Sequence, residues 1–442
     1  MDRSEAVILR PYQEDLVRRV ALAFRRGRAG VMQMATGGGK TACAATIIER
    51  AVAKGRRVVF AAHLDTLVGD TYERLVKAGV HAGYVQSGRP SDPTAPTQVA
   101  SLATLYSRGE RPPADLVIVD ECHRAASASV REILESYPHA WILGLTATPQ
   151  RGDGQPLGDI FGWMECGPAT RELTAQGHLV PSDVVAPEAP VEALVIEPVN
   201  AYFKYCVGRR AIVFATNVVH AEWIAYGLTA RGVPAAVVTG ETPRAEREAS
   251  RAALAEGRLG ALVSVNVFVE GWDCPAVDAV ILAREFSVVG SFLQAIGRGL
   301  RPFPGKTDCV VVDLRGSVNL HGLPDEDRAW SLTGKPKRTE ALPALRRCLK
   351  CAAIFRPART CPRCGAVSDA KAEGAKLPRI LDRDEKLERL SHLSQGDRDR
   401  RYLMSLVNVA INRMRMPEHR AEQWAMRAFE KKFGRAYGEH AA

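Results

Sequence analysis

The chain has 442 residues, of which 46% are hydrophobic and only 6% aromatic. This composition excludes a disordered or fibrous chain, and the length corresponds to about three domains of ordinary size. The formal charge of +10 is concentrated at one end: residues 331–442 hold 25 basic and 13 acidic residues, whereas residues 1–330 hold 35 and 37. Such a basic segment indicates a polyanionic partner, with nucleic acid favoured over a membrane surface.

The sequence carries no signal for export or membrane insertion. No run reaches the ~18 apolar residues that a membrane-spanning helix needs, and the charged residues 1–5 are not followed by an apolar leader core. Six of the ten cysteines are scattered and four are clustered, which is not the pattern of a disulfide framework. We therefore expect a reducing, cytoplasmic location and no membrane partner.

Short β-branched runs alternate with helix-like stretches in the first part of the chain. The predicted strands are 30–34, 57–61, 98–100, 116–119 and 141–145, and an Ala-rich helix is predicted over 41–53. This alternation predicts an α/β fold with a buried parallel sheet.

The alternation stops at residues 166–198, which are rich in Pro and Glu and are predicted to be a connector. It then resumes, with predicted strands at 211–214, 235–238, 261–265, 279–283 and 309–313. We therefore divide the chain into a first α/β domain (1–165), the connector (166–198), a second α/β domain (199–332), a cysteine-containing unit (340–370) and a basic helical tail (380–442).

A glycine-rich turn joins the strand 30–34 to the helix 41–53. It reads Met34-Ala35-Thr36-Gly37-Gly38-Gly39-Lys40-Thr41, with Met34 where the general pattern has glycine. The glycines let backbone N–H groups point inward at phosphates, and the helix N-terminus adds the positive end of its dipole. Lys40 would reach the β- and γ-phosphates of ATP, and the Thr41 hydroxyl would hold Mg²⁺. The alternative is a strand-to-helix turn that binds no ligand.

Two acidic residues follow the apolar strand 116–119, in the run Asp120-Glu121-Cys122-His123. The carboxyl end of a parallel strand is where α/β sheets bind ligands. Asp120 would hold Mg²⁺, Glu121 would orient and deprotonate the attacking water, and His123 would link the site to the rest of the domain. The alternative is a capped strand end with solvated acids, but the phosphate loop upstream favours the catalytic interpretation.

Together, Gly-Gly-Gly-Lys-Thr and Asp-Glu-x-His resemble the DExH type of superfamily 2 helicases, and the resemblance covers about residues 7–330. It implies two tandem RecA-like domains that hydrolyse ATP in the cleft between them. It also implies that Gln13 reads the adenine edge with Arg10 beside the base. Thr146-Ala147-Thr148-Pro149 resembles motif III, which couples hydrolysis to movement.

Two further motifs of this family fall in the second domain. Glu270-Gly271-Trp272-Asp273 resembles motif V, in which Gly271 and Asp273 would approach the nucleotide ribose. The run from Gln294 to Arg301 resembles motif VI, with Gln294 as a coupling residue. We expect Arg298 and Arg301, three residues apart, to share one helix face. The resemblance makes them arginine fingers that neutralise transition-state charge.

Segments 211–216, 239–242 and 270–275 resemble the bacterial and phage branch that is related to XPB-like helicases and restriction-enzyme translocases. This branch implies action on DNA, by unwinding, by fork or branch remodelling, or by translocation. Three alternatives stay open: an RNA remodeller, a motor subunit that works with a nuclease or a replication or repair factor, and a nucleotide-gated binding protein.

Four cysteines form two pairs at metal-ligand spacing, Cys348-x2-Cys351 and Cys361-x2-Cys364. Each pair lets two thiolates face one ion, and four thiolates fit tetrahedral structural Zn²⁺. An iron–sulfur cluster or free, redox-active thiols are the alternatives. Basic residues surround the pairs: Arg346, Arg347, Lys350, Arg356, Arg359 and Arg363. The predicted zinc ribbon would either contact backbone phosphates or only brace the tail.

The tail combines basic and aromatic residues. A helix with one apolar face is predicted over 399–414, and Trp424, Phe429 and Phe433 lie among Lys and Arg residues. These aromatic side chains would either stack on nucleic-acid bases or form a small core.

Overall fold

The computed structural model describes residues 8–63, 65–124, 127–151, 155–187, 196–265, 274–334, 345–367 and 426–427. The chain divides into two compact units, residues 1–378 and residues 379–442. The predicted helical tail, apart from Met426 and Arg427, lies outside the described residues, and so do Gly271 and Asp273 of the predicted motif V. No helix within the described ranges is long and apolar enough to cross a membrane.

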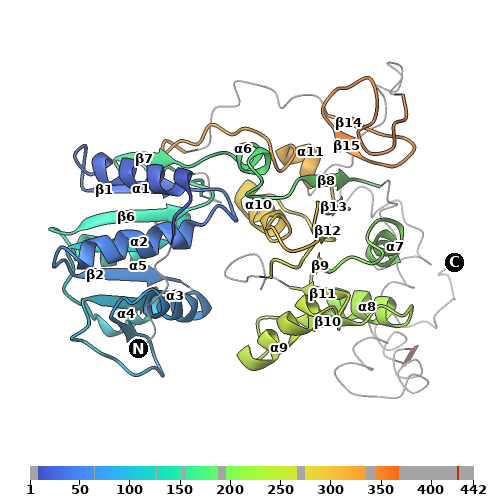
Figure 1. Cartoon of the computed structure of the whole chain (residues 1–442). Helices are drawn as coiled ribbons and strands as arrows, with labels where there is room; N and C mark the ends of the chain where they lie inside the picture. Colours follow the sequence, from blue (N-terminus) through green and yellow to red (C-terminus); the bar gives the residue numbers. More distant parts are fainter. Residues whose placement is uncertain are drawn as a thin grey trace, which may run out of the picture. The chain divides into compact units, whose positions relative to one another are not determined.

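The first unit contains a seven-stranded sheet whose neighbouring strands are all parallel. Figure 1 shows it, and its spatial order is β3 (Ala82–Val85), β4 (Thr97–Ser101), β2 (Val58–Ala62), β5 (Leu116–Asp120), β6 (Trp141–Thr146), β1 (Ala29–Gln33) and β7 (Trp163–Cys166). β2 and β5 are buried along their whole length, as expected for a parallel sheet covered on both faces.

Two hydrophobic cores lie on the two faces of this first sheet. One core packs inward side chains of α1 (Pro11–Ala23), α2 (Lys40–Val52) and α3 (Asp65–Lys77) on the sheet. The other packs α4 (Leu102–Arg108) and α5 (Ala128–Glu135) on alternate residues of the same strands. Because side chains alternate along a strand, Phe60 enters the first core while Val59 enters the second.

A six-stranded sheet, again with all neighbours parallel, forms the second α/β domain (Figure 1). Its spatial order is β10 (Ala235–Val238), β11 (Ala261–Ser264), β9 (Ala211–Phe214), β12 (Ala279–Leu282), β13 (Cys309–Asp313) and β8 (Ser182–Val185). One core contains residues of α7 (Ile196–Tyr205) and α8 (Val218–Thr229). The other contains residues of α6 (Thr170–Ala175), α9 (Arg244–Ala255), α10 (Val289–Gly297) and α11 (Ser317–His321).

The two parallel-sheet α/β domains confirm the predicted fold class. The segment predicted as a connector, however, is not a plain linker. It holds α6 and β8, and β8 pairs with β13 from Ser182↔Cys309 to Val185↔Val312. β8 begins with Ser182 and Asp183 and contains only two valines, so no long apolar stretch indicated a strand there.

After β13 the chain returns to the first α/β domain, at the loop between β6 and β7, and then forms a small antiparallel pair. The carbonyl of Leu332 accepts hydrogen bonds from the N–H groups of Leu157, at 2.9 Å, and Gly158, at 2.8 Å. Beyond it, β14 (Arg346–Arg347) pairs with β15 (Ile354–Phe355). We call the described residues 345–367, which include the four clustered cysteines, the cysteine ribbon.

Candidate active site

The glycine-rich turn connects β1 to α2 as predicted, and its backbone needs glycine. Gly37 and Gly39 have φ angles of 86° and 93°, a region that side chains with a Cβ rarely adopt. A Cβ on Gly39 would also lie 2.1 Å from Nε2 of Gln13, and one on Gly37 would lie 2.8 Å from Leu179. The turn is therefore a close-fitting backbone cradle, which is the shape a phosphate chain requires.

Gln13 and Tyr12 brace this cradle from α1. Nε2 of Gln13 donates to the carbonyl of Gly38 at 2.9 Å, and the Tyr12 hydroxyl donates to the same carbonyl at 2.8 Å. Oε1 of Gln13 in turn accepts from the backbone N–H of Arg10 at 2.9 Å. Recognition of adenine by Gln13 and Arg10 therefore stays a prediction, and the observed contacts hold the loop.

Lys40, at the first position of α2, meets both acids at the end of β5. Its Nζ lies 2.6 Å from Oε1 of Glu121 and 3.0 Å from Oδ1 of Asp120. Burial alone would lower the pKa of Lys40, but the two carboxylates outweigh it and raise that pKa. Burial also disfavours ionised Glu121, yet Lys40 and His123 hold the pKa of Glu121 below its ordinary value. At neutral pH the Lys40 ammonium therefore faces an ionised Glu121 carboxylate.

Glu121 adopts a strained backbone conformation and has partners on both oxygens. Its φ of 49° lies in the left-handed region, which is uncommon for a residue with a side chain and clusters at functional sites. Its Oε2 lies 3.4 Å from Nδ1 of His123 and accepts from Nε2 of Gln294 at 3.2 Å. Since Gln294 belongs to α10, Glu121 joins the two α/β domains.

The predicted coupling residues form one hydrogen-bonded chain behind Glu121. His123, in the short 3₁₀ helix Cys122–Arg124, places Nδ1 3.1 Å from the Thr146 hydroxyl. That hydroxyl also accepts from the backbone N–H of Thr148 at 3.1 Å. The strand end that carries the acids is therefore connected to the segment that follows β6.

The arginines of the second domain lie in the same place but not on one helix face. α10 ends at Gly297, so Arg298 is its C-cap and Arg301 lies in the loop beyond it. A Cβ on Gly299 would lie 2.3 Å from Sγ of Cys309, which shows how closely this loop approaches the sheet. The expectation of one helix face was wrong, because the helix has to end before the chain can make that approach.

Residues that were predicted in the first and in the second α/β domain nevertheless line one common pocket. We call it the cleft pocket. Its lining includes these predicted residues: Thr36, Gly37, Gly39, Lys40, Thr41, Asp120, Glu121, Gln294, Arg298 and Arg301. Arg301 lies against the cradle, since its Cγ is 3.5 Å from the position that a Cβ on Gly37 would take. Burial, with Arg74 nearby, lowers the pKa of Arg301 to about 10, so the guanidinium stays charged at neutral pH.

Comparison with known families agrees with this division into two halves. Residues 6–151 match the family described as "Type III restriction enzyme, res subunit", and residues 197–302 match the "Helicase conserved C-terminal domain". The first match covers the cradle and both acids, and the second covers Gln294, Arg298 and Arg301. The chain belongs to the superfamily 2 helicases of the DExH type.

Individual relatives of this helicase include a phage protein and a fungal one. A 51.5 kDa protein of Lactococcus phage (isolate 7-9) is 26% identical over 350 residues, covering 74% of this chain and 75% of that protein. The protein irc3 of Schizosaccharomyces pombe, a proposed mitochondrial ATP-dependent helicase, is 28% identical over 366 residues, covering 72% of this chain and 60% of that protein. The helicase thus spans between half and three quarters of the length of such relatives.

A solved structure shares the fold. A fragment of a proposed HsdR subunit of a type I restriction enzyme from Vibrio vulnificus YJ016 superposes with a TM-score of 0.57 at 24% sequence identity. The similarity covers 71% of this chain and 65% of that one. It therefore extends over both α/β domains and supports a RecA-like architecture for the helicase core.

Sequence reasoning missed the part of the cleft pocket that α3 supplies. Leu67, Asp70, Thr71 and Arg74 all line it. Burial raises the pKa of Asp70, while Arg244 and Arg74 oppose that shift. The four residues follow the i, i+3, i+4, i+7 spacing of one helix face, which is the signal that could have identified them together.

Two glycines of α10 face the first domain. A Cβ on Gly297 would lie 2.5 Å from Cβ of Thr36 in the cradle, and one on Gly290 would lie 2.7 Å from the Thr148 hydroxyl. They are seven residues apart and therefore on one side of the helix. This helicase thus brings its two domains into backbone-close contact along α10.

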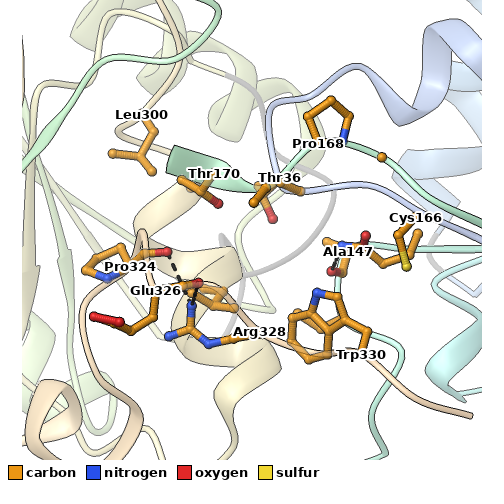
Figure 2. Close-up of a pocket in the computed structure, with 17 residues that line it drawn as sticks. Thr36, Ala147, Cys166, Pro168, Thr170, Leu300, Pro324, Glu326, Arg328 and Trp330 are labelled. Carbon is orange, nitrogen blue, oxygen red and sulfur yellow. Dashed lines mark hydrogen bonds between the residues drawn. The ribbon is translucent and has the colours of Figure 1, made fainter. Parts of the chain in front are cut away.

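A second pocket shares Ala35, Thr36 and Ala147 with the cleft pocket (Figure 2). Thr36 and Ala147 of the first domain line it together with Arg328 and Trp330, which follow α11. The Arg328 guanidinium donates to the backbone carbonyls of His321, Leu323, Pro324 and Glu326. Arg328 is therefore used to hold its own loop rather than to present a free charge to this pocket.

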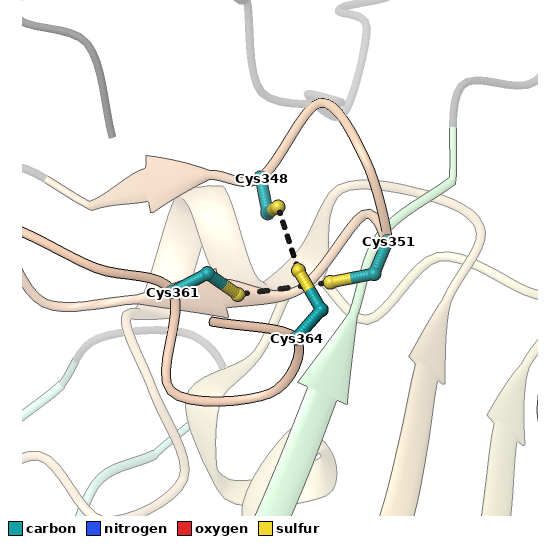
Figure 3. Close-up of side chains that lie close together, drawn as sticks. All are labelled: Cys348, Cys351, Cys361 and Cys364. Atoms are coloured by element: carbon teal, nitrogen blue, oxygen red, sulfur yellow. Dashed lines mark hydrogen bonds between the residues drawn. The ribbon is translucent and has the colours of Figure 1, made fainter. Parts of the chain in front are cut away.

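The four cysteines come together as predicted (Figure 3). Their Sγ atoms all lie within 4.8 Å of one another, with Cys348 to Cys364 at 3.6 Å and Cys351 to Cys361 at 3.7 Å. Tetrahedral Zn²⁺ with Zn–S bonds of about 2.3 Å sets its sulfurs about 3.8 Å apart, whereas a disulfide bond is about 2.05 Å long. The cluster therefore has the dimensions of a metal site and not of two disulfides.

Side chains and backbone of the cysteine ribbon dock on the edge of the second sheet. Val185 of β8 forms an antiparallel bridge with Ala353, and the N–H of Ala186 donates to the carbonyl of Ala352 at 2.9 Å. Ile354 belongs to the core of the second domain and is 5% exposed.

Three of the surrounding basic residues serve this docking. Arg347 donates to the carbonyl of Ala186 at 2.8 Å, Arg363 pairs with Asp183 at 2.8 Å, and Arg356 pairs with Asp325 at 2.9 Å. The sequence analysis offered two roles for the cysteine ribbon, contact with phosphates or support of the tail. The structure shows a third role, which is to cover the edge strand β8.

Proposed function

We propose that this chain hydrolyses ATP in the cleft pocket and uses the energy to move along or open DNA. The observation that carries the proposal is the joint lining of one pocket by Lys40, Asp120 and Glu121 from the first domain and by Gln294 and Arg301 from the second. Phosphoryl transfer needs this set of parts: a cradle, a cation for the phosphates, acids, and arginines for the transition state.

Each side chain has a role that its chemistry permits. Lys40 holds the β- and γ-phosphates, and Glu121 orients the attacking water and takes its proton. Arg298 and Arg301 neutralise the charge that develops on the transferred phosphoryl group. Gln294 senses the state of Glu121, with which it shares a hydrogen bond at 3.2 Å.

Mg²⁺ fits the donor set on the first domain. Thr41 and Asp120 both line the cleft pocket and present oxygen ligands, which Mg²⁺ prefers. When bound, Mg²⁺ neutralises part of the phosphate charge. Lys40, 3.0 Å from Asp120, keeps this buried carboxylate paired until nucleotide arrives.

Movement follows from the contact between the domains. The hydrogen-bonded chain from His123 through Thr146 ends at the backbone N–H of Thr148, and the side chain of Thr148 lies next to Gly290 of α10, so a change at Glu121 reaches the second domain by two routes. Closure of the cleft brings the arginines to the phosphates, and opening releases them. Repeated closing and opening would advance a strand held across both domains.

DNA is the favoured substrate. The first domain matches a restriction-enzyme family, and a restriction-enzyme subunit has the same fold over both domains. Restriction enzymes act on DNA. The main alternatives are an RNA remodeller with the same core and a motor subunit that works with a separate nuclease or repair factor.

The deciding experiment measures ATP turnover alone and with single-stranded DNA, duplex DNA, forked DNA and RNA. We expect a DNA ligand to stimulate turnover most, with Lys40→Ala as the blank. Stronger stimulation by RNA would overturn the DNA assignment. Turnover at the level of the blank with every ligand would contradict an autonomous motor and favour either a missing partner or a nucleotide-gated binding protein.

We further propose that the four cysteines hold structural Zn²⁺. Their mutual distances suit a tetrahedral ion, and no position is left open for a substrate. In this role the metal fixes the cysteine ribbon, and the ribbon covers the outer edge of β8 and protects it from other strands. Measurement of the metal content of the purified chain tests this directly, with one zinc per chain expected.

A further inference from the structure

Lys306 lies in the turn between α10 and β13 and points back into the second domain. Its Nζ donates to the carbonyl of Arg301 at 2.7 Å and to that of Pro275 at 3.1 Å, and it also donates to the carbonyl of Val277. An ammonium group has three N–H donors and no acceptor, so these three carbonyls satisfy all of its hydrogen-bonding capacity.

The contact matters because Arg301 has no helix to hold it. α10 ends at Gly297, and two carbonyls of the loop that follows serve as anchors, because they accept hydrogen bonds that connect the loop to other segments. The carbonyl of Leu300 accepts from the N–H of Val180 at 2.8 Å, and the carbonyl of Arg301 accepts from Lys306. The first anchor fixes the loop to the segment before β8, and the second fixes it to the turn before β12.

We propose that Lys306 is a positioning residue for Arg301: its ammonium group fixes the backbone of the arginine-finger loop to the turn at Pro275–Val277. The proposal rests on the role assigned to Arg301 under the proposed function. Lys306 does not line the cleft pocket in the described structure, so it acts through Arg301 and not on the nucleotide.

Electrostatics agree with a charged Lys306 that is held firmly. Burial lowers the pKa of Lys306 to about 8, while Cys309, Asp278 and Cys274 favour the charged form and Arg301 disfavours it. An ammonium group taken out of water has to be compensated by hydrogen bonds, and three carbonyl dipoles provide this compensation. Loss of the Lys306 side chain would remove this donor from the carbonyl of Arg301 and from the two carbonyls of the turn.

The geometry also connects two motifs. Pro275 and Val277 follow directly on the segment that resembles motif V, and Arg301 closes the segment that resembles motif VI. One side chain thus connects the residues that follow the first segment to the end of the second segment. A displacement of about 1 Å at a catalytic group is enough to reduce turnover by about 100-fold.

The test is a double-mutant cycle on the full chain, with forked DNA as activator. Lys306→Met keeps the length and removes the charge, and it is combined with Arg301→Ala. We expect Lys306→Met alone to lower kcat by about 10- to 100-fold with KM for ATP within about threefold. In the Arg301→Ala background the same change should cost less than about twofold, because the group that it positions is absent. Lys54→Met, at an exposed position after α2, is the control.

Lys306→Arg keeps a positive charge, but its longer, planar guanidinium cannot place three donors at the single point that the Lys306 ammonium occupies. It keeps the test informative if Lys306→Met fails to fold, and it should also lower kcat only when Arg301 is present. Equal losses in both backgrounds, or no loss at all, would overturn the positioning role. If Arg301→Ala itself leaves kcat unchanged, the role of Arg301 in the proposed function is wrong and this inference falls with it.

Discussion

The last strands of the two sheets, β7 and β8, are protected in different ways. β7 is covered by α1, whose Arg19 pairs with Glu165 at 2.7 Å and donates to the carbonyl of Cys166 at 2.9 Å. β8 is covered by the cysteine ribbon through the bridge Val185↔Ala353. The first domain therefore completes itself with its own helix, whereas the second domain depends on a segment from beyond its last strand.

The proposed catalytic groups of the two domains differ in a similar way. Lys40 and Asp120 stand at a helix start and a strand end, and they neutralise each other within the first domain. Arg301 stands in a loop, where its own carbonyl accepts from Lys306 and the carbonyl of Leu300 accepts from Val180, in the segment before β8. Substitutions in the first domain should therefore abolish ATP binding or turnover directly. Substitutions in the second domain should displace the arginines or lower its thermal stability.

The largest effects are expected at Lys40 and Glu121, and the two should differ in kind. Lys40→Ala removes the cation for the phosphates, so both ATP binding and turnover should fall, turnover by about 10²–10⁴-fold. Glu121→Gln keeps the shape and removes the base, so turnover should fall by about 10²–10⁴-fold while ATP still binds. Turnover and nucleotide affinity, measured separately, check this. Wild-type turnover in either variant would remove the proposed site.

A smaller effect is expected where the two domains touch. Gly290→Ala places a methyl group against Thr148, where a Cβ would lie 2.7 Å from the hydroxyl. Opening the cleft relieves this clash, so kcat should fall by about tenfold with little change in thermal stability. Gly240→Ala, where a Cβ would meet nothing within 4 Å, is the matched control. A loss of stability without a loss of kcat would place the clash within one domain and contradict a closing contact.

Strands and motif residues could be predicted from the sequence, whereas the contacts between the domains could not. Continuous apolar strands such as 211–214 and 309–313 were predicted with the observed bounds, because a strand buried on both faces leaves a clear run. The lysine, the acids and the arginines were found from local motifs. The helix end at Gly297 and the contacts of Lys306 were not predicted. The first depends on a close approach of backbone to the sheet and the second on backbone carbonyls, and neither leaves a pattern of side-chain types in the sequence.

Removal of the proposed zinc should affect stability more than chemistry. Chelation would release the cysteine ribbon and expose Ile354, which alone costs about 1.5–3 kcal/mol. The melting temperature of the second domain should fall by roughly 4–10 °C, while nucleotide binding by the first domain persists. Cys361→Ser should reproduce the loss, and Cys166→Ser, outside the cluster, should not. An unchanged melting curve after complete metal removal would show that β8 is covered without the metal.

The smallest expected effect comes from a comparison of the two cysteine pairs, Cys348/Cys351 and Cys361/Cys364, whose backbones make the same hydrogen bond. In both, the N–H after the second cysteine donates back to the first cysteine's carbonyl, from Ala352 to Cys348 and from Gly365 to Cys361, each at 2.9 Å. The donor has a positive φ in both, 61° at Ala352 and 69° at Gly365. The positive φ favours glycine. The Cys361/Cys364 pair has Gly365 at this position, and the Cys348/Cys351 pair has Ala352, which adopts the same conformation at some cost.

Two separate variants, Gly365→Ala and Ala352→Gly, should therefore change the zinc affinity to different extents. Gly365→Ala adds backbone strain of about 1 kcal/mol with no packing gain, since a Cβ there meets nothing within 4 Å, so zinc affinity should weaken by about fivefold. Ala352→Gly relieves similar strain but loses a methyl group that is 8% exposed, and the two changes nearly cancel, so affinity should stay within about twofold. Competition with a chromogenic chelator measures both. Equal weakening in the two variants would mean that the metal site tolerates no change at either turn, and the dependence on backbone strain would be wrong.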